Sequence, residues 1–348
     1  MRKIVLILLP VCLIAVVASV FVILFIYNKF ESDGLEIPSL FSIENNFANS
    51  IDFMEKELEK NGMTTYICTS NFSDCAGLKN SIFMKALIFS LLKEIDSEKF
   101  SFFIKQGINE ILDCQGEHFL WDFSGTHSTD IGSYFPDLDT TFLSAAFLTS
   151  QGIEFHLQEI KEEILKTQLE NGILLTYLRD FQPPYSHTMN VDPVVNANAL
   201  ALLGKEIPSV CDFINKNYGK SVYYKDDAVV FYMLSKAYLK GVTCAKPAIN
   251  KLYNKLKKSD LLKSRHRPLH LSMFITASLK TQKERVSIDK AIKTLFAEDH
   301  ILPFREHFFS YDFPRKHTYF YSPLFSAAVY AEALTNIKSY LSEQDTRR

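Results

Sequence analysis

The chain of 348 residues has few of the residue types that make turns and sugar-binding platforms. It contains 12 glycines, 12 prolines and a single tryptophan, Trp121. Because a many-stranded β fold needs frequent turns, this composition argues against one. The formal net charge of −2 indicates neither a basic surface for nucleic acid nor an acidic tail for a basic partner. A glycine-rich phosphate loop, a nucleophile elbow and a CxxC motif are also missing from the sequence.

The first 30 residues predict a membrane anchor. An uncharged apolar run of 24 residues extends from Ile4 to Tyr27, and about 20 helical residues cross the core of a bilayer. Arg2 and Lys3 precede this run and Lys29 alone follows it, which favours a cytoplasmic N-terminus. We therefore expect a single-pass membrane protein with the bulk of the chain on the non-cytoplasmic side. The alternative is a cleavable signal peptide, whose apolar region is usually only about 7–15 residues long.

The cysteines allow two disulfide bonds outside the cytosol. Cys68 with Cys75 and Cys211 with Cys244 are the plausible pairs, and Cys114 is then left over. Buried, reduced cysteines are the alternative interpretation of the same five residues.

Two kinds of helix alternate along the rest of the chain. Residues 31–78 are expected to form a linker, a leading helix from Ile43 to Lys60 and a loop from Tyr66 to Gly77. Beyond residue 78, six expected helices are apolar nearly all round: 81–92, 140–149, 193–203, 228–239, 269–279 and 323–334. Five amphipathic helices are expected between them: 101–112, 153–168, 209–216, 245–257 and 283–295.

This alternation predicts the fold. A helix without a polar face must be buried, and an amphipathic helix covers it. A regular succession of such pairs is a repeat, and a ring of six pairs gives every apolar helix a neighbour on both sides. We therefore predict an all-α fold, an (α/α)6 toroid spanning residues 79–348, behind the N-terminal anchor of residues 1–30.

Polar side chains collect where the apolar helices begin. Since the inner helices of such a ring run the same way, their first residues share one mouth, and this mouth is the candidate site. It is expected to gather Asp137, Asp139, Thr140, Asp192, Asn196, Asn198, Asp226, Asp227, Tyr321 and Ser322, together with Tyr185 and His187.

Two motifs carry a resemblance to a known superfamily. Asp137-Leu-Asp139-Thr-Thr141 resembles the DxDD-T signature of class II terpene cyclases, in which the middle acid protonates an alkene or an epoxide. Gln168-Leu-Glu-Asn-Gly172 with Tyr177 is similar to the Gln…Gly…Trp motif of the same proteins. Over roughly residues 78–338, the chain thus resembles the terpenoid cyclase and protein prenyltransferase toroids.

The resemblance implies a chemistry for the mouth. Asp139 would be the catalytic acid, with Asp137 and Thr140 orienting it, and the substrate would be an isoprenoid or another lipid-like molecule. No cofactor is implied, except Mg²⁺ if the substrate carries a diphosphate. The chain departs from the pattern because Thr140 replaces the last acid of the signature and because class II cyclases generally combine two helical domains. The Asp-x-Cys zinc ligands of the prenyltransferases are missing as well.

Simpler interpretations stand beside the catalytic one. Aspartate and serine are preferred helix N-caps, so capping alone explains Asp139 and Asp192. Asn196 and Asn198 lie inside a buried helix and need partners, either in a cavity or on neighbouring helices. Pro268 interrupts the run Arg265–His270, which makes a zinc site there improbable and leaves no predicted metal site.

Other functions remain open from the sequence. A non-catalytic toroid could bind a protein or a glycan, and the protein partner is unknown. Asp139 and Asp192, on neighbouring helices, could also form the carboxylate pair of a carbohydrate-active toroid. One tryptophan counts against a sugar-binding groove.

Overall fold

The computed structural model describes residues 36–68, 75–78, 81–123, 125, 136–177, 190–264, 266–297, 302–304, 306–313 and 316–346. The predicted anchor, residues 1–30, lies outside them, and so do Tyr185 and His187. None of the helices in the described ranges is long and apolar enough to cross a membrane.

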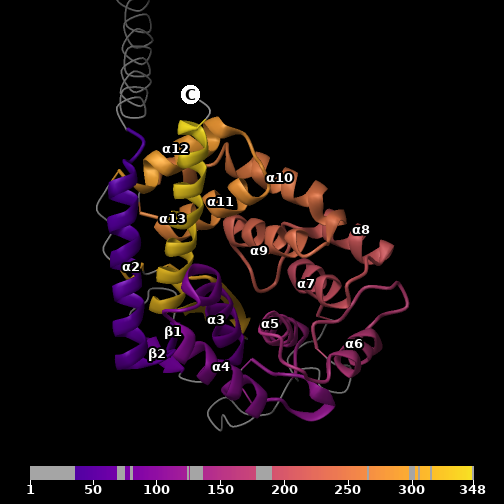
Figure 1. The fold of residues 1–348 in the computed structure, drawn as a ribbon. Helices are drawn as coiled ribbons and strands as arrows, with labels where there is room; N and C mark the ends of the chain where they lie inside the picture. Colours follow the sequence, from indigo (N-terminus) through magenta and orange to yellow (C-terminus); the bar gives the residue numbers. More distant parts are fainter. Residues whose placement is uncertain are drawn as a thin grey trace, which may run out of the picture.

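Six helices form a closed inner ring. They are α3 (Ile82–Asp96), α5 (Leu138–Ser150), α7 (Pro193–Leu203), α9 (Asp227–Leu239), α11 (Pro268–Lys280) and α13 (Pro323–Asp345). Each inner helix packs against the next one, and α13 packs against α3, which closes the ring (Figure 1). The described chain is therefore an all-α toroid, as the alternation of helices predicts.

In the described ranges, six further helices lie outside this ring and cover it (Figure 1). They are α2 (Leu40–Asn61), α4 (Ser101–Asp113), α6 (Leu157–Lys166), α8 (Pro208–Asn217), α10 (Lys246–Leu256) and α12 (Arg285–Leu295). The leading helix α2 packs on α13, so it completes the outer layer.

Burial separates the two layers. In α5, every residue from Leu138 to Ala145 is buried, because the helix has neighbours on all sides. In α6, only Ile160 and Ile164 are buried, one turn apart on a single face. An outer helix can therefore keep its charged face in water, whereas an inner helix must satisfy its polar groups within the protein.

The inner helices all begin at one end of the ring. The N-cap of α7, Asp192, bonds to the segment that precedes α9, and the N-cap of α9, Asp226, bonds to Arg267 at the start of α11. At the other end, Lys236 of α9 and Lys280 of α11 meet Glu332 of α13. We call the end where the helices begin the acid mouth and the end where they finish the far end.

A small antiparallel sheet lies beside the acid mouth. Its strands β1 (Thr65–Cys68), β2 (Cys75–Leu78), β3 (Phe309–Phe313) and β4 (Lys316–Tyr321) are ordered β2-β1-β4-β3. In the register of β1 and β4, Tyr66 lies opposite Tyr321, the residue before the N-cap of α13. The expectation of a loop over residues 66–77 was therefore wrong for the parts that form β1 and β2.

The predicted disulfide between Cys211 and Cys244 is confirmed. Cys211 of α8 and Cys244, just before α10, form a disulfide that links two successive outer helices. Cys68 is also disulfide-bonded, and it lies opposite Cys75 in the register of β1 and β2. Cys114 is a free, half-buried thiol.

Candidate functional site

Asp137 is a buried acid that starts α5. As its N-cap, it accepts a hydrogen bond from the backbone N–H of Thr140 over 2.8 Å. Burial raises the pKa of Asp137 to about 8, because the carboxylate loses its hydration and the bond from Thr140 offsets only part of that loss. Asp137 is thus a helix cap that holds its proton near neutral pH.

Asp139, in the first turn of α5, connects to two neighbouring segments. The side-chain amide of Asn198, in α7, donates to Oδ1 over 2.7 Å, and the hydroxyl of Tyr224, just before α9, donates to Oδ2. Burial raises the pKa of Asp139 to about 7, and the charge of Asp192 adds to this, while the bonds from Tyr224 and Asn198 oppose it. A carboxyl group that is still partly protonated at neutral pH can act as a general acid.

Asp192 is the N-cap of α7 and also an anchor for a loop. Its Oδ1 accepts from the N–H groups of Val194 and Val195, over 2.8 and 3.3 Å. Its Oδ2 accepts from the hydroxyl of Ser221 and the N–H of Val222, each over 2.7 Å. Burial raises the pKa of Asp192, and these bonds oppose the rise. Its contacts in the structure are those of a cap and an anchor.

The two asparagines of α7 differ in what they contact. Asn196 makes three hydrogen bonds, all to backbone groups. Its Oδ1 accepts from the N–H of Leu174 over 3.0 Å, and its NH2 group donates to the carbonyls of Leu174 and Asp192 over 2.9 and 3.0 Å. Asn198, two residues on, contacts the carboxyl of Asp139 instead. Bonding to neighbouring segments therefore accounts for Asn196, and Asn198 is the amide that joins the acid.

Thr140 does not contact the carboxyl of Asp139 in the way that an orienting residue would. Its backbone N–H donates to Asp137, and its buried hydroxyl lowers the pKa of Asp137 rather than bonding to Asp139. The groups that orient the Asp139 carboxyl are therefore Asn198 and Tyr224.

Aromatic rings continue from Tyr224 across the acid mouth. The ring of Tyr224 meets Phe308 edge to face, at 5.7 Å between centroids. Phe308 lies 4.5 Å from Phe325 and 6.3 Å from Phe83, and Phe83 stacks on Phe123 at 5.6 Å. The acid thus stands beside a group of rings whose faces attract cations.

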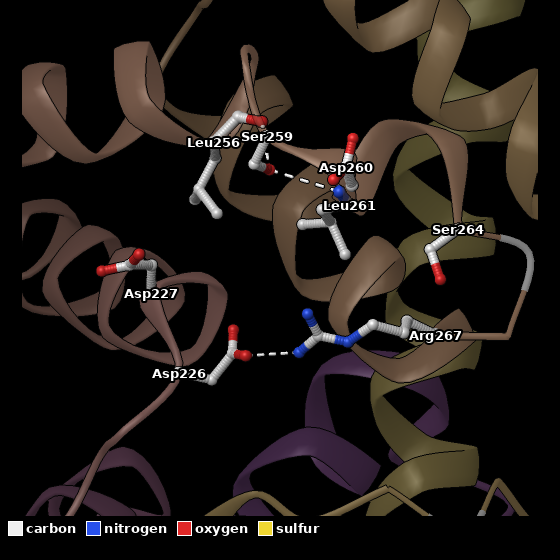
Figure 2. A pocket seen from close by; sticks show the side chains of 8 residues that line it. All are labelled: Asp226, Asp227, Leu256, Ser259, Asp260, Leu261, Ser264 and Arg267. Atoms are coloured by element: carbon white, nitrogen blue, oxygen red, sulfur yellow. Dashed lines mark hydrogen bonds and ion pairs between the residues drawn. The ribbon is translucent and has the colours of Figure 1, made fainter.

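A separate polar group surrounds the starts of α9 and α11. A pocket here has a volume of about 240 Å³. Figure 2 shows the residues that line it: Asp226, Asp227, Leu256, Ser259, Asp260, Leu261, Ser264 and Arg267. Although burial opposes its ionisation, the charges of His270 and Arg267 hold the pKa of Asp226 below its usual value. Asp227 pairs with Lys255 over 2.6 Å. Asp226 and Asp227 therefore have their charge partners within this second group.

The other predicted mouth residues have structural partners. Tyr321, at the end of β4, stacks on Tyr66 with centroids 5.9 Å apart. Ser322 caps α13 by accepting from the N–H of Phe325 over 3.2 Å. Nothing in the described chain places Tyr185 and His187, which lie outside it.

Metal ligands are scarce in the part of the chain that the structure describes. One group of three potential ligands lies together there, made of Glu206, Cys211 and Cys244. Because the two cysteines are bonded to each other, they are unavailable to a metal. His270, which the sequence places near a candidate zinc motif, bonds through Nδ1 to Glu306.

Comparison with known proteins supports the class of fold. The ring of six helix pairs is similar in fold to the toroid of a terpene cyclase. The type II terpene cyclase MstE of Scytonema matches with a TM-score of 0.61 at 11% identity, over 86% of this chain and 98% of that chain. At this identity the likeness is one of fold alone.

Two further solved structures match less well. Two structures of the alpha-2-macroglobulin of Escherichia coli match with TM-scores of 0.46 and 0.44, at 13% and 14% identity. They cover 84% and 82% of this chain and 17% and 42% of their own chains. The sequence matches neither a known protein family nor a curated protein.

Tyr224 and Phe308 belong to this site but were not predicted from the sequence. Tyr224 lies two residues before the N-cap of α9, so its place at the mouth follows from the same rule that placed Asp226 there. Phe308 precedes β3, whose position depends on the unexpected sheet. The abundance of phenylalanine, 29 residues, gave only a general sign of aromatic lining.

Proposed function

We propose that this protein is a membrane-anchored enzyme of the terpenoid-cyclase type, in which Asp139 protonates an alkene or an epoxide of an isoprenoid or similar lipid-like substrate. The observation that carries the proposal is the Asp139 carboxyl itself. It is buried, it is held at both oxygens by Asn198 and Tyr224, and its pKa is raised to about 7.

The chemistry follows from this environment. The O–H bond of protonated Asp139 breaks, a C–H bond forms at one carbon of the substrate double bond, and the positive charge appears on the other carbon. An ionised carboxyl has no proton to donate, so burial that keeps the group protonated supports this step. Opening an epoxide uses the same proton at the oxygen.

The aromatic group supports the later stage of the same reaction. A carbocation is stabilised by the faces of aromatic rings. Tyr224, which bonds to the acid, begins a group of five rings: Phe308 contacts Tyr224, Phe325 and Phe83, and Phe83 stacks on Phe123. Apolar rings also suit an isoprenoid chain, because they bury its methyl groups away from water.

The length of the chain is compatible with this activity. The MstE chain, described as a type II terpene cyclase, is covered over 98% of its length by this single toroid. One ring therefore spans nearly all of that protein, so a single toroid is compatible with the proposal. The replacement of the last signature acid by Thr140 leaves Asp139, the middle acid, in place.

The proposal includes a membrane anchor, formed by residues 1–30. Their apolar run would hold the toroid at the bilayer in which isoprenoid lipids dissolve, with the bulk of the chain on the non-cytoplasmic side. Mg²⁺ enters only for a substrate that carries a diphosphate, whose negative charge it would offset.

Turnover by the full-length protein in detergent micelles or nanodiscs tests the proposal. The substrates are squalene, oxidosqualene and geranylgeranyl diphosphate with Mg²⁺, and loss of substrate is followed by mass spectrometry. Asp139→Asn should lower turnover by about 100-fold or more, the usual contribution of a general acid. Asp212→Asn, at an exposed position on α8, is the matched control and should keep full turnover.

Two results would contradict the proposal. One is turnover that survives Asp139→Asn while circular dichroism shows an intact fold. The other is the absence of turnover of all three substrates by the wild-type protein, which would favour a non-catalytic toroid that binds a protein or a glycan. A glycosidase is disfavoured because Asp192, the second carboxylate of the pair, is engaged by the start of α7 and the loop before α9.

A further inference from the structure

We infer that Asp192 is a positioning residue for Asp139, and that it acts through Ser221 and Tyr224. The inference rests on the proposed role of Asp139 as an acid, and it adds a second set of residues to that site. It assigns to the segment between α8 and α9 the task of fixing the direction of the acid.

A continuous series of hydrogen bonds links the two carboxyl groups. Oδ2 of Asp192 accepts from the hydroxyl of Ser221 over 2.7 Å and from the N–H of Val222 over 2.7 Å. The hydroxyl oxygen of Ser221 accepts from the N–H of Tyr224 over 2.9 Å. The hydroxyl of Tyr224 then donates to Oδ2 of Asp139.

The hydrogen bonds from Asp192 matter because Tyr224 lies in an irregular segment. Residues 218–226 connect α8 to α9 without forming a helix or a strand, so the regular backbone bonds of those elements do not fix Tyr224. Ser221 and Tyr224 are nevertheless buried, at 7% and 1% exposure. The anchor on Asp192 fixes the backbone of Tyr224, and Phe308 holds its ring from the side.

The two partners of Asp139 have different hydrogen-bonding capacity. As placed in the structure, Asn198 faces Oδ1 of Asp139 with its NH2 group, which only donates, whereas the hydroxyl of Tyr224 can donate to an ionised carboxyl and accept from a protonated one. This difference favours Oδ2 as the oxygen that carries the transferable proton. The series from Asp192 therefore fixes the oxygen that reacts.

The titration of Asp139 in variants of the full-length protein tests the inference. Aspartate is labelled with ¹³C at the carboxyl carbon, and the Asp139 signal is the one that Asp139→Asn removes. Tyr224→Phe deletes a bond that lowers the pKa of Asp139, so the pKa should rise, by about one unit for one such bond. Ser221→Ala removes the acceptor of the Tyr224 backbone N–H and should raise the pKa of Asp139 in the same direction by a smaller amount.

The double variant separates positioning from general damage. If Ser221 acts through Tyr224, adding Ser221→Ala to Tyr224→Phe should change the pKa of Asp139 no further. Ser221→Thr, which keeps a hydroxyl, should restore the wild-type value. Ser81→Ala removes another buried cap at the same mouth, on α3, and should leave the titration unchanged.

Two results would overturn the inference. One is a wild-type pKa of Asp139 in Ser221→Ala, and the other is a full additional effect of Ser221→Ala in the Tyr224→Phe background. Either result leaves the turnover test of Asp139→Asn untouched. Conversely, a protein without turnover can still show the coupled titration, so the failure of the inference and that of the proposed function are distinguishable.

Discussion

At the far end of the ring, the buried carboxylate of Glu332 links three inner helices, α9, α11 and α13. The variant Glu332→Gln therefore tests the packing of the ring. Glu332, in α13, is 3% exposed and meets Lys236 of α9 over 2.8 Å and Lys280 of α11 over 2.7 Å. The hydroxyl of Tyr232 donates to its other oxygen over 2.6 Å. Glutamine keeps the size of the side chain but removes its charge, so the two ammonium groups lose their buried partner.

The magnitude follows from the ionisation of Glu332. Burial opposes the charged form, but the charges of Lys236 and Lys280 lower the pKa of Glu332 to about 2 from its ordinary value of 4.5. That difference corresponds to about 3 kcal/mol, which agrees with the cost of about 3–5 kcal/mol for breaking a buried ion pair. We therefore expect Glu332→Gln to lower the free energy of unfolding by about 3 kcal/mol at pH 7.

The pH dependence has a defined sign. The folded pKa lies below the unfolded one, so Glu332 stabilises the fold fully above about pH 5 and loses this contribution as the pH falls from 4.5 towards 2. The gap between the wild-type protein and Glu332→Gln should therefore narrow between pH 5 and pH 3. The free energy of unfolding of Glu332→Gln should therefore fall less between pH 5 and pH 3 than that of the wild-type protein.

Urea unfolding of the full-length protein in mild detergent, followed through the fluorescence of the single, buried Trp121, measures these differences. Glu94→Gln is the matched control: Glu94 meets the same two lysines, but its side chain is 46% exposed. Such an exposed pair contributes less than about 1 kcal/mol. Equal effects of the two variants, or a gap that stays constant with pH, would refute the reasoning.

Three further predictions concern stability. Replacing Cys211 and Cys244 by serine should lower the free energy of unfolding by about 3–4 kcal/mol, because the disulfide closes a loop with a sequence separation of 33; unchanged urea midpoints would count against it. Gly107→Ala should cost about 1–3 kcal/mol, since the new Cβ would lie 2.0 Å from the ring of Phe89, and a thermal midpoint equal to that of the wild type would show that the ring moves freely. Because the pKa values of Asp137 and Asp139 are raised in the folded state, that state binds more protons than the unfolded state, and the contribution of the two residues to the free energy of unfolding falls as the pH rises from about 4 to 8. Asp139→Asn should therefore lose less unfolding free energy over this pH range than the wild type, and an equally steep loss would contradict the prediction.

The sequence predicted the ring well because local patterns determine it. The start of α7 at Pro193 and the start of α13 at Pro323 were both predicted to the residue, since a cap followed by proline marks a helix start strongly. The sheet escaped prediction for the opposite reason. Its four strands have four to six residues each, and β1 pairs with β4 across the whole length of the ring sequence. Because Tyr66 and Tyr321 are far apart in the sequence, their pairing produces no local periodicity from which the strands could be predicted.

The site was predicted in part. The helix-start rule found Asp139, and the cost of burying a polar amide singled out Asn198 as a residue that needs a partner. The sequence could not show that each is the partner of the other, nor that Asn196 bonds to the backbone instead. Tyr224 belongs to an irregular segment, so the direction of its side chain depends on the contacts of Asp192 with the loop. Long-range contacts of this kind decide which polar residues meet, and no local pattern records them.

The titration of the Asp139 carboxyl in the wild-type protein tests the central claim most directly. In the ¹³C-labelled full-length chain, the signal that Asp139→Asn removes should titrate with a pKa of about 7, because burial outweighs the bonds from Tyr224 and Asn198. A pKa near the ordinary 3.8 would mean that Asp139 is ionised at neutral pH and has no proton to give. That result would contradict its role as the acid of this toroid.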